Sequence, residues 1–258
     1  MAIIIKSKSD LKQMRKSGRA AQKLLNTLGE AAQAGSTGRE LDALARKLLA
    51  QMGARSPFLG KKAGGPAYPC AITVSTNEAI VHGIPTYNPF HNGDIVALDV
   101  GVLLGGFIGD TAGTFAIGTP APRAERLMRI SNEALYKGIE KAVVGNTVGD
   151  ISAAIQNHVE GHGYSVVREL VGHGVGRTMH EDPNVPNFGK AGTGPKLRPG
   201  MTLAIEPMVN EGSAKVKCLA DQWTYVTADG GLSAHYEHTV AILSDGPEIL
   251  TIDERTEI

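Results

Sequence analysis

The sequence GSTGREL at residues 35–41 recurs in altered form as GNTVGDI at residues 145–151, about 110 residues later. In both stretches a threonine stands two residues after the first glycine, and an acidic residue stands three residues after the threonine. Glycine suits the left-handed exit of a helix, whereas threonine followed by such an acid is a capping box that begins a new helix. The two stretches therefore predict the same helix–turn–helix corner twice in one chain.

The residues on either side of these corners extend the repeat. Before them, helices are expected at about residues 10–34 and 123–143, because both segments are rich in helix-forming residues. After them, apolar residues follow at helical spacing. They are Leu41, Leu44 and Leu48 in the first half and Ile151, Ile155 and Val159 in the second.

Strand-like segments follow each pair of helices, ending near residue 118 in the first half and near residue 250 in the second. The layout of helix, helix and strands thus occurs over about 10–118 and again over about 123–250. This pattern predicts an α+β fold of two related halves, in which outer helices cover an antiparallel sheet and a site lies between the halves. The alternative is a chance resemblance between two capping sequences.

Composition narrows the class of function. The 258 residues carry a formal net charge of zero, with 42% hydrophobic and 20% charged residues, so neither a nucleic-acid footprint nor a polybasic membrane patch is indicated. The apolar run in residues 1–6 is too short for a signal peptide, and no apolar stretch of 18 residues occurs. Cys70 and Cys218 show no CxxC spacing, which fits a reducing compartment. We predict a cytoplasmic protein with small or peptide-like partners.

Four carboxylates and one imidazole each lie inside a short apolar, strand-like run. Burying four unpaired carboxylates would cost many kcal/mol, and these runs contain neither lysine nor arginine. Metal ions are the simplest compensation, and two dications would balance four negative charges. Oxygen-rich ligation with one imidazole suits manganese, iron, cobalt or zinc, and bridging carboxylates allow two adjacent ions. The five residues are Asp99, Asp110, His173, Glu206 and Glu237.

The first two of these residues are brought together by a predicted hairpin. The sequence LGGF at residues 104–107 indicates a two-residue turn between two strands. That register sets Asp99 opposite Ala112 and makes Asp110 its diagonal neighbour on the same face, with the backbones of the two residues roughly 7 Å apart. A longer loop would shift the register and separate the two carboxylates.

The two glutamates occupy different strand positions. Glu206 precedes Pro207, which cannot donate to a sheet, so this strand is expected to end there or to run at an edge. Glu237 is expected in the middle of a strand, on the same face as His235 and Thr239.

The sequence around His173 and His180 contains glycines at 172, 174 and 176, which indicates a tightly turned backbone rather than one helix face. Their spacing alone does not show that they share a ligand. One histidine could bind metal while the other reaches substrate.

Six motifs carry a resemblance to a known family. In order and spacing they resemble the methionine aminopeptidases, and the type I subclass in particular, over nearly the whole chain. The resemblance implies the pita-bread (creatinase/aminopeptidase) fold of two pseudo-symmetric halves, with residues 1–258 as a single catalytic domain. It also implies removal of the N-terminal methionine from nascent proteins whose second residue is small. The motifs are NEAIVHGIP (77–85), GDIVALDVG (93–101), GDTAGTF (109–115), GHGVGRTMHEDPNVPN (172–187), AIEPM (204–208) and SAHYEHT (233–239).

The resemblance also implies roles for individual residues. Asp110 and Glu237 would bridge two divalent ions, and His82 and His180 would contact the substrate. In such a centre a metal-bridging hydroxide attacks the scissile carbonyl, Glu206 shuttles the proton, and His180 stabilises charge on the carbonyl oxygen. The implied metal ligands are Asp99, Asp110, His173, Glu206 and Glu237.

The pocket for the methionine side chain is implied to consist of Tyr68, Thr73, Met179 and Trp223. Thr73 stands where a cysteine is frequent in bacterial relatives, and Met179 stands where an aromatic residue is frequent. Both substitutions keep the pocket roughly apolar. The native metal among cobalt, manganese, iron and zinc is left open by oxygen-rich ligation.

Two other functions are compatible with parts of the pattern. An X-prolyl peptidase of the same fold has similar metal ligands but usually carries a large additional amino-terminal domain, and a metal-free relative would be a binding protein. Only 25 residues separate His180 from Glu206, so the long insertion of the type II branch does not fit. The expected partners are peptides with N-terminal methionine, nascent chains and the ribosome, with no membrane or sequence-specific nucleic acid, and the expected state is a monomer.

Overall fold

The computed structural model describes residues 2–62 and 64–252 and contains four α-helices within them. Both capping boxes are present. The backbone N–H of Thr37 donates to Glu40 at 2.8 Å, and that of Thr147 donates to Asp150 at 2.7 Å. The predicted repeat of the helix corner is therefore confirmed. The helices are α1 (Lys8–Ala31), α2 (Gly38–Gln51), α3 (Pro122–Ile139) and α4 (Val148–Gly161).

The first helix of each half ends earlier in the chain than the sequence predicted. The helix α1 ends at Ala31 instead of residue 34, and α3 ends at Ile139 instead of residue 143. Gly35 and Gly145 have φ of 90° and 95°, so they turn the connecting loop rather than cap the helix directly. The extended backbone of Ala32 ends α1 before it reaches that glycine.

Fourteen strands accompany these helices within the described residues. Eight of them form one antiparallel sheet in the order β1-β3-β4-β13-β8-β6-β7, with β14 paired to β13. Two small sheets, β10-β11-β2 and β12-β9-β5, complete the fold. The strands are β1 (Thr73–Thr76), β2 (Ala79–Val81), β3 (Ile95–Leu104), β4 (Phe107–Ala116), β5 (Ser165–Val166), β6 (Gly172–Gly174), β7 (Glu181–Val185), β8 (Thr202–Ile205), β9 (Met208–Asn210), β10 (Val216–Cys218), β11 (Tyr225–Thr227), β12 (Ser233–His235), β13 (Glu237–Leu243) and β14 (Gly246–Ile249).

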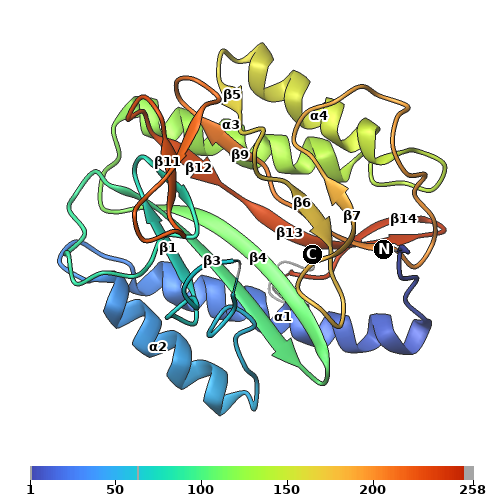
Figure 1. Ribbon diagram of the computed structural model, residues 1–258, viewed down its shortest axis with the longest axis horizontal. Coiled ribbons are helices and arrows are strands. Elements are labelled where there is room, and N and C mark those ends of the chain that lie inside the picture. The colour runs from blue at the N-terminus through green and yellow to red at the C-terminus, as the bar shows by residue number, and fades with distance from the viewer. Residues whose placement is uncertain (1, 63, 253–258) are drawn as a thin grey trace.

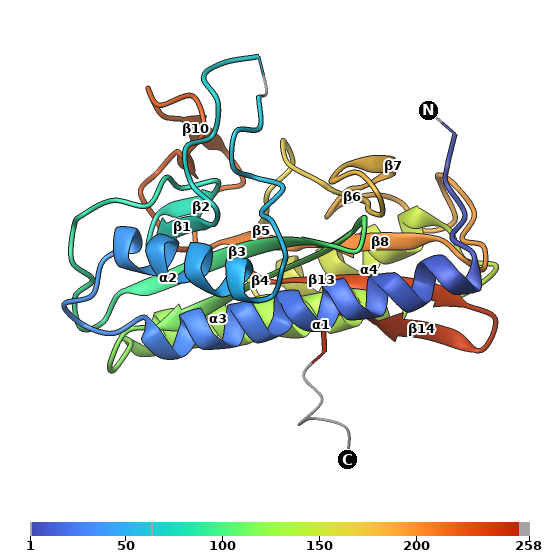
Figure 2. The same ribbon diagram turned by 90° about the horizontal axis from the view of Figure 1, so that it is seen from below.

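The two halves share the large sheet. The first half contributes β1, β3 and β4, and the second contributes the remaining strands, so the pairing of β4 with β13 joins them. Figure 1 shows the β3–β4 hairpin crossing in front of α1, with α2 to its lower left and α3 and α4 beside the strands of the second half. In Figure 2 the long helix α1 runs beneath the sheet, while β2 and β10 of a small sheet lie above it. The predicted α+β architecture of two related halves is confirmed.

Each half buries its helices against its own strands. Leu24, Leu28 and Leu41 from α1 and α2 pack with Val96 and Leu98 of β3 in one apolar cluster. A second cluster packs α3 and α4, the helices of the second half, against strands of that half. Burial of such side chains stabilises a fold by roughly 1.5–3 kcal/mol each, so these clusters fix the strands from which the site is built.

Close backbone contact brings α1 directly against the hairpin. A Cβ atom added at Gly109 of β4 would lie 2.5 Å from the backbone nitrogen of Gly18 in α1. Glycine is therefore required at Gly109 for the helix and strand to touch. No helix among the described residues is long and apolar enough to cross a membrane.

Candidate metal centre

The β3–β4 hairpin places two acidic residues on one face of the large sheet. Leu104 pairs with Phe107, and Asp99 lies opposite Ala112, which is the register predicted from the two-glycine turn. Gly105 and Gly106 have φ of 60° and 83°, the left-handed backbone that a two-residue hairpin turn needs. Because side chains alternate along a strand, Asp110 shares the face of Ala112.

The second half adds Glu237 to the same face. Glu237 lies opposite Ala112 from the other side, so Asp99 and Glu237 flank one residue of β4. The hydroxyl of Thr239 accepts a hydrogen bond from the Asp110 backbone N–H at 3.0 Å and donates to the Asp110 carbonyl at 2.8 Å. This pair of contacts holds β4 against β13 beside the acidic groups.

The predicted strand position of Glu237 is wrong in one respect. The backbone leaves the ladder at Tyr236, so β12 ends at His235 and Glu237 is the first residue of β13 rather than its middle. The two strands separate because β12 pairs with β9, whereas β13 pairs with β4 and β8. Glu237 nevertheless faces the cluster from the end of its strand.

The remaining two candidates come from the neighbouring strands β6 and β8. His173 of β6 lies opposite Ala204 of β8. Strand β8 ends at Ile205, so Glu206 leaves the ladder just before Pro207, as the sequence predicted. This strand lies between β13 and β6 rather than at an edge of the sheet.

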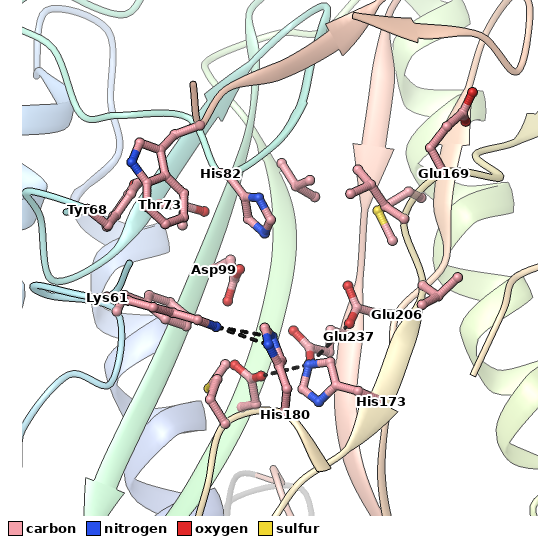
Figure 3. A pocket seen from close by; sticks show the side chains of 18 of the residues that line it. Lys61, Tyr68, Thr73, His82, Asp99, Glu169, His173, His180, Glu206 and Glu237 are labelled. Carbon is pink, nitrogen blue, oxygen red and sulfur yellow. Dashed lines mark hydrogen bonds and ion pairs between the residues drawn. The ribbon is translucent and has the colours of Figure 1, made fainter. Parts of the chain in front are cut away.

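The five side chains converge in space. Figure 3 labels four of them and shows them close together, namely Asp99, His173, Glu206 and Glu237. The Nε2 atom of His173 lies 3.7 Å from Oδ2 of Asp110 and 3.5 Å from Oε1 of Glu206. Ligand atoms of Asp110, His173 and Glu237 all lie within 4.8 Å of one another. These separations are too long for good hydrogen bonds but suit side chains that share a cation.

Three buried carboxylate oxygens of this cluster lack a hydrogen-bond partner among the described residues. They are Oδ1 of Asp99, Oδ1 of Asp110 and Oε1 of Glu237. Buried polar atoms in folded proteins are almost always satisfied, so three unpartnered oxygens on residues that line one cavity indicate a cation site. The donor set and its orphaned atoms fit divalent metal ions.

Burial dominates the electrostatics of the cluster. It raises the pKa of Asp99 to about 7 and that of Glu206 to about 8, and it raises the pKa of Asp110 and Glu237 well above the usual range. The neighbouring carboxylates add to the rise at Asp110 and Glu237. All four acids can be ionised together only beside compensating positive charge.

The ring of His173 is neutral and has an unprotonated nitrogen that can bind a metal ion. Burial, followed by the nearby His180, lowers the pKa of its ring to about 3, so the imidazole is neutral. Its Nδ1–H donates to the carbonyl of Gly174 at 2.9 Å. The Nε2 atom is therefore the unprotonated nitrogen, and it faces the carboxylates, an arrangement that metal-binding histidines commonly use.

A cavity of about 470 Å³ opens onto the cluster, and every site residue predicted from the sequence lines it. Tyr68 and Trp223 meet edge to face with ring centres 5.2 Å apart. The Tyr68 hydroxyl donates to the carbonyl of Gly83 at 2.8 Å, which fixes the ring in the wall. Thr73 lies directly opposite Asp99 in the β1–β3 ladder, so the apolar wall adjoins the acidic cluster.

Comparison with known proteins identifies the family of this fold and site. The model of metallopeptidase family M24 matches residues 12–244. The chain belongs to this family. The resemblance to the methionine aminopeptidases that the six motifs carry is thereby confirmed.

Individual M24 relatives extend this result. The chain is 51% identical over 250 residues to the methionine aminopeptidase of Clostridium perfringens, covering 97% of this chain and 99% of the relative. It is similar to the crystal structure of methionine aminopeptidase from Thermotoga maritima, with a TM-score of 0.94, 43% identity and coverage of 98% and 100%. The prolidase of Pyrococcus horikoshii has a TM-score of 0.78 at 26% identity, covering 99% of this chain but 65% of that one.

His82 and His180, the two predicted substrate contacts, lie on opposite sides of the cavity (Figure 3). His82 follows β2 with a φ of 59°, an uncommon conformation for a residue with a side chain, and its ring faces Trp223 at 6.4 Å. His180 lies in the turn between β6 and β7, with its ring centre 4.4 Å from that of His173. Both can therefore reach a molecule bound at the cluster.

Two charged or titratable neighbours of the cluster were not predicted. His235 places Nε2 at 3.6 Å from Oε2 of Glu206. Lys61 lines the cavity and reaches His180, although it stands 38 residues before Asp99 in a segment without strand or helix pattern. Only the tertiary fold brings this lysine close, and no local signal in the sequence indicates it.

Proposed function

We propose that this chain is a metal-dependent aminopeptidase that removes the N-terminal methionine from nascent proteins when the second residue is small. The observation that carries the proposal is the convergence of four acids and one neutral imidazole beside an apolar wall in one cavity. The names and full-length similarity of the methionine aminopeptidase relatives support it.

Two divalent ions would be held by the clustered side chains, and the resemblance to the family implies that Asp110 and Glu237 would be shared between them. Each of these two residues has a buried carboxylate oxygen without a hydrogen-bond partner among the described residues. When bound, such ions polarise a carbonyl and make a water more acidic, which gives hydrolysis at neutral pH. Cobalt, manganese, iron and zinc all suit oxygen ligands with one imidazole. The proposed ligands are Asp99, Asp110, His173, Glu206 and Glu237.

The remaining chemistry belongs to residues that this chain supplies at the cavity. The carboxylate of Glu206, free of the sheet ladder, would take the proton of the attacking water and return it to the leaving amine. A ring N–H of His180 would donate to the carbonyl oxygen as negative charge develops there. His82 would contact the peptide from the opposite side of the cavity.

Selectivity for methionine would come from the wall formed by Tyr68, Thr73, Met179 and Trp223. Trp223 is held in place by a hydrogen bond from Nε1 to the carbonyl of Pro66 at 3.0 Å. Phe58 and Cys70 belong to the same apolar cluster as the two rings. A slot with these side chains favours an unbranched thioether, because its apolar surface is removed from water without losing a hydrogen bond.

An X-prolyl peptidase is the alternative enzyme, because prolidases share this fold. The prolidase comparison has lower identity and covers 65% of that chain, whereas the methionine enzymes match over almost their full length. A metal-free binding protein is the alternative outside catalysis. The intact set of five converging ligands argues against it.

The test compares release of the first residue from Met-Ala-Ser and from Leu-Pro-Ser. The protein is stripped with a chelator and reloaded separately with manganese, iron, cobalt or zinc. We expect metal-dependent cleavage of the methionyl peptide alone. Cleavage of only the prolyl peptide would move the protein to the rival peptidases, and no cleavage with any metal would support the binding protein.

The substrate has consequences for location and partners. A nascent chain as substrate supports work in the cytoplasm close to the ribosome, and the resemblance to the type I enzymes supports a monomer. Sedimentation of the purified protein with and without ribosomes tests the last two predictions together.

A further inference from the structure

The side chain of Lys61 enters the cavity and points at His180. Its Nζ atom lies 3.1 Å from Nδ1 and 3.3 Å from Nε2 of the ring. Figure 3 shows the lysine reaching across from the side of Tyr68 toward the histidine. An ammonium group has three donors and no acceptor, so it can donate only to the ring nitrogen that carries no proton.

The backbone holds Lys61 in this position through the same segment that forms the apolar wall. The Lys61 N–H donates to the carbonyl of Phe58 at 2.9 Å, and the Lys61 carbonyl accepts from Tyr68 N–H at 2.8 Å. The N–H of Gly60 donates to the Tyr68 carbonyl at 2.8 Å. The backbone around Lys61 is thus hydrogen-bonded to that of the buried Tyr68. This fixes the point from which the lysine side chain enters the cavity.

The contact itself requires a neutral ring. An ammonium donor can hydrogen-bond to a ring nitrogen at 3.1 Å only where that nitrogen is an acceptor, so His180 carries a proton on no more than one of its two nitrogens. A neutral ring has one acceptor nitrogen and one N–H, and the acceptor is taken by the lysine.

We propose that Lys61 is a positioning residue for His180, whose ring it turns so that the remaining N–H faces the carbonyl oxygen of the substrate. This inference rests on the proposed function, because the carbonyl is that of a methionyl peptide. The lysine does not itself touch the reacting atoms. It fixes which ring nitrogen donates and in which direction, and orientation of this kind accounts for a large share of a rate.

Four variants separate this role from others. Lys61→Met removes the charge and keeps most of the side-chain length, Lys61→Arg keeps a cation, and His180→Ala removes the group that is positioned. The fourth variant combines Lys61→Met with His180→Ala. Lys47→Met is the matched control, because Lys47 is exposed on α2 and undergoes the same change of charge. For each variant kcat, KM and bound metal are measured on Met-Ala-Ser at saturating metal.

We expect Lys61→Met to lower kcat by roughly ten- to a hundredfold with little change in KM or bound metal, because orientation is lost but binding remains. Lys61→Arg should recover most of this loss, and Lys47→Met should match the parent protein. The double variant should be no slower than His180→Ala alone, because Lys61 acts only through that ring. A further loss in the double variant would overturn the proposal. So would a loss of metal in Lys61→Met, which would make the lysine part of the ion site.

A spectroscopic measurement keeps this inference separate from the reaction. The ¹⁵N chemical shifts of His180 in the full chain should show one neutral tautomer, and Lys61→Met should convert it to a mixture. Unchanged shifts in Lys61→Met would refute the contact even if the enzyme is active. Failure to cleave Met-Ala-Ser with a changed spectrum would refute the proposed function but leave the lysine–histidine contact established.

Discussion

Replacement of Lys6 by methionine tests how the amino-terminal segment supports the active-site turn. Lys6 and Glu181 form an ion pair in which each side chain is 3% exposed. They stand 175 residues apart, so the pair connects the start of the chain to strand β7. Glu181 also accepts the backbone N–H groups of Arg177 at 3.0 Å and Thr178 at 3.4 Å. The glutamate thus holds the turn that carries His180.

The size of the effect follows from what Lys6→Met leaves behind. Methionine has nearly the same length and fills the same space, so the main loss is the positive charge. Removing one partner of a buried ion pair costs about 3–5 kcal/mol, because the remaining charge stays buried without compensation. The two backbone donors that remain on Glu181 place the loss toward the lower part of that range. For a chain of this length, roughly 2–4 °C per kcal/mol and a loss near 3 kcal/mol give a fall in Tm of about 6–12 °C.

Thermal unfolding followed by circular dichroism measures this change, with Lys12→Met as the control. Lys12 is exposed on α1, and its replacement should alter stability by less than about 0.5 kcal/mol. Turnover of Lys6→Met at a temperature where it remains folded should also fall, since the turn before His180 loosens. A Tm for Lys6→Met within about 1 °C of that for Lys12→Met would refute the reasoning that this pair is buried and structurally required.

Three further changes address the metal centre and the fold. Glu237→Gln removes a proposed bridging charge and should lower turnover by about a hundredfold or more while metal analysis shows less bound metal; normal activity with full metal would contradict the bridging role. His180→Ala should retain its metal and lose about a hundred- to a thousandfold in kcat, and metal loss there would instead make it a ligand. Gly109→Ala should destabilise the protein by at least about 1–3 kcal/mol in urea unfolding, because its Cβ would meet the backbone of Gly18; unchanged stability would show that the helix and strand can separate cheaply.

The sequence predicted the acidic pair on β3 and β4 because a two-residue turn fixes every residue pairing of a hairpin. The two glycines at residues 105 and 106 therefore determined that Asp99 faces Ala112, and the structure has this register. The end of β8 before Glu206 followed from Pro207 for a similar local reason. Local backbone chemistry was sufficient in both cases.

Features that depend on distant contacts were not predictable in this way. The break at Tyr236 arises because β12 and β13 pair with different strands, although the sequence reads as one continuous apolar run. The approach of Lys61 to His180 joins residues 119 positions apart and leaves no periodic signal. The roles of His82 and His180 came from the family resemblance, since a histidine in a loop has no local pattern that distinguishes a substrate contact.

The central claim is that removal of methionine depends on metal held by the clustered acids and His173. The most direct test adds manganese or cobalt stepwise to chelated protein while bound metal and cleavage of Met-Ala-Ser are measured in the same sample. The account predicts no cleavage by the stripped protein, activity that rises as metal binds, and saturation at two ions per chain. Full cleavage by the stripped protein, or activity without bound metal at the cluster, would contradict it.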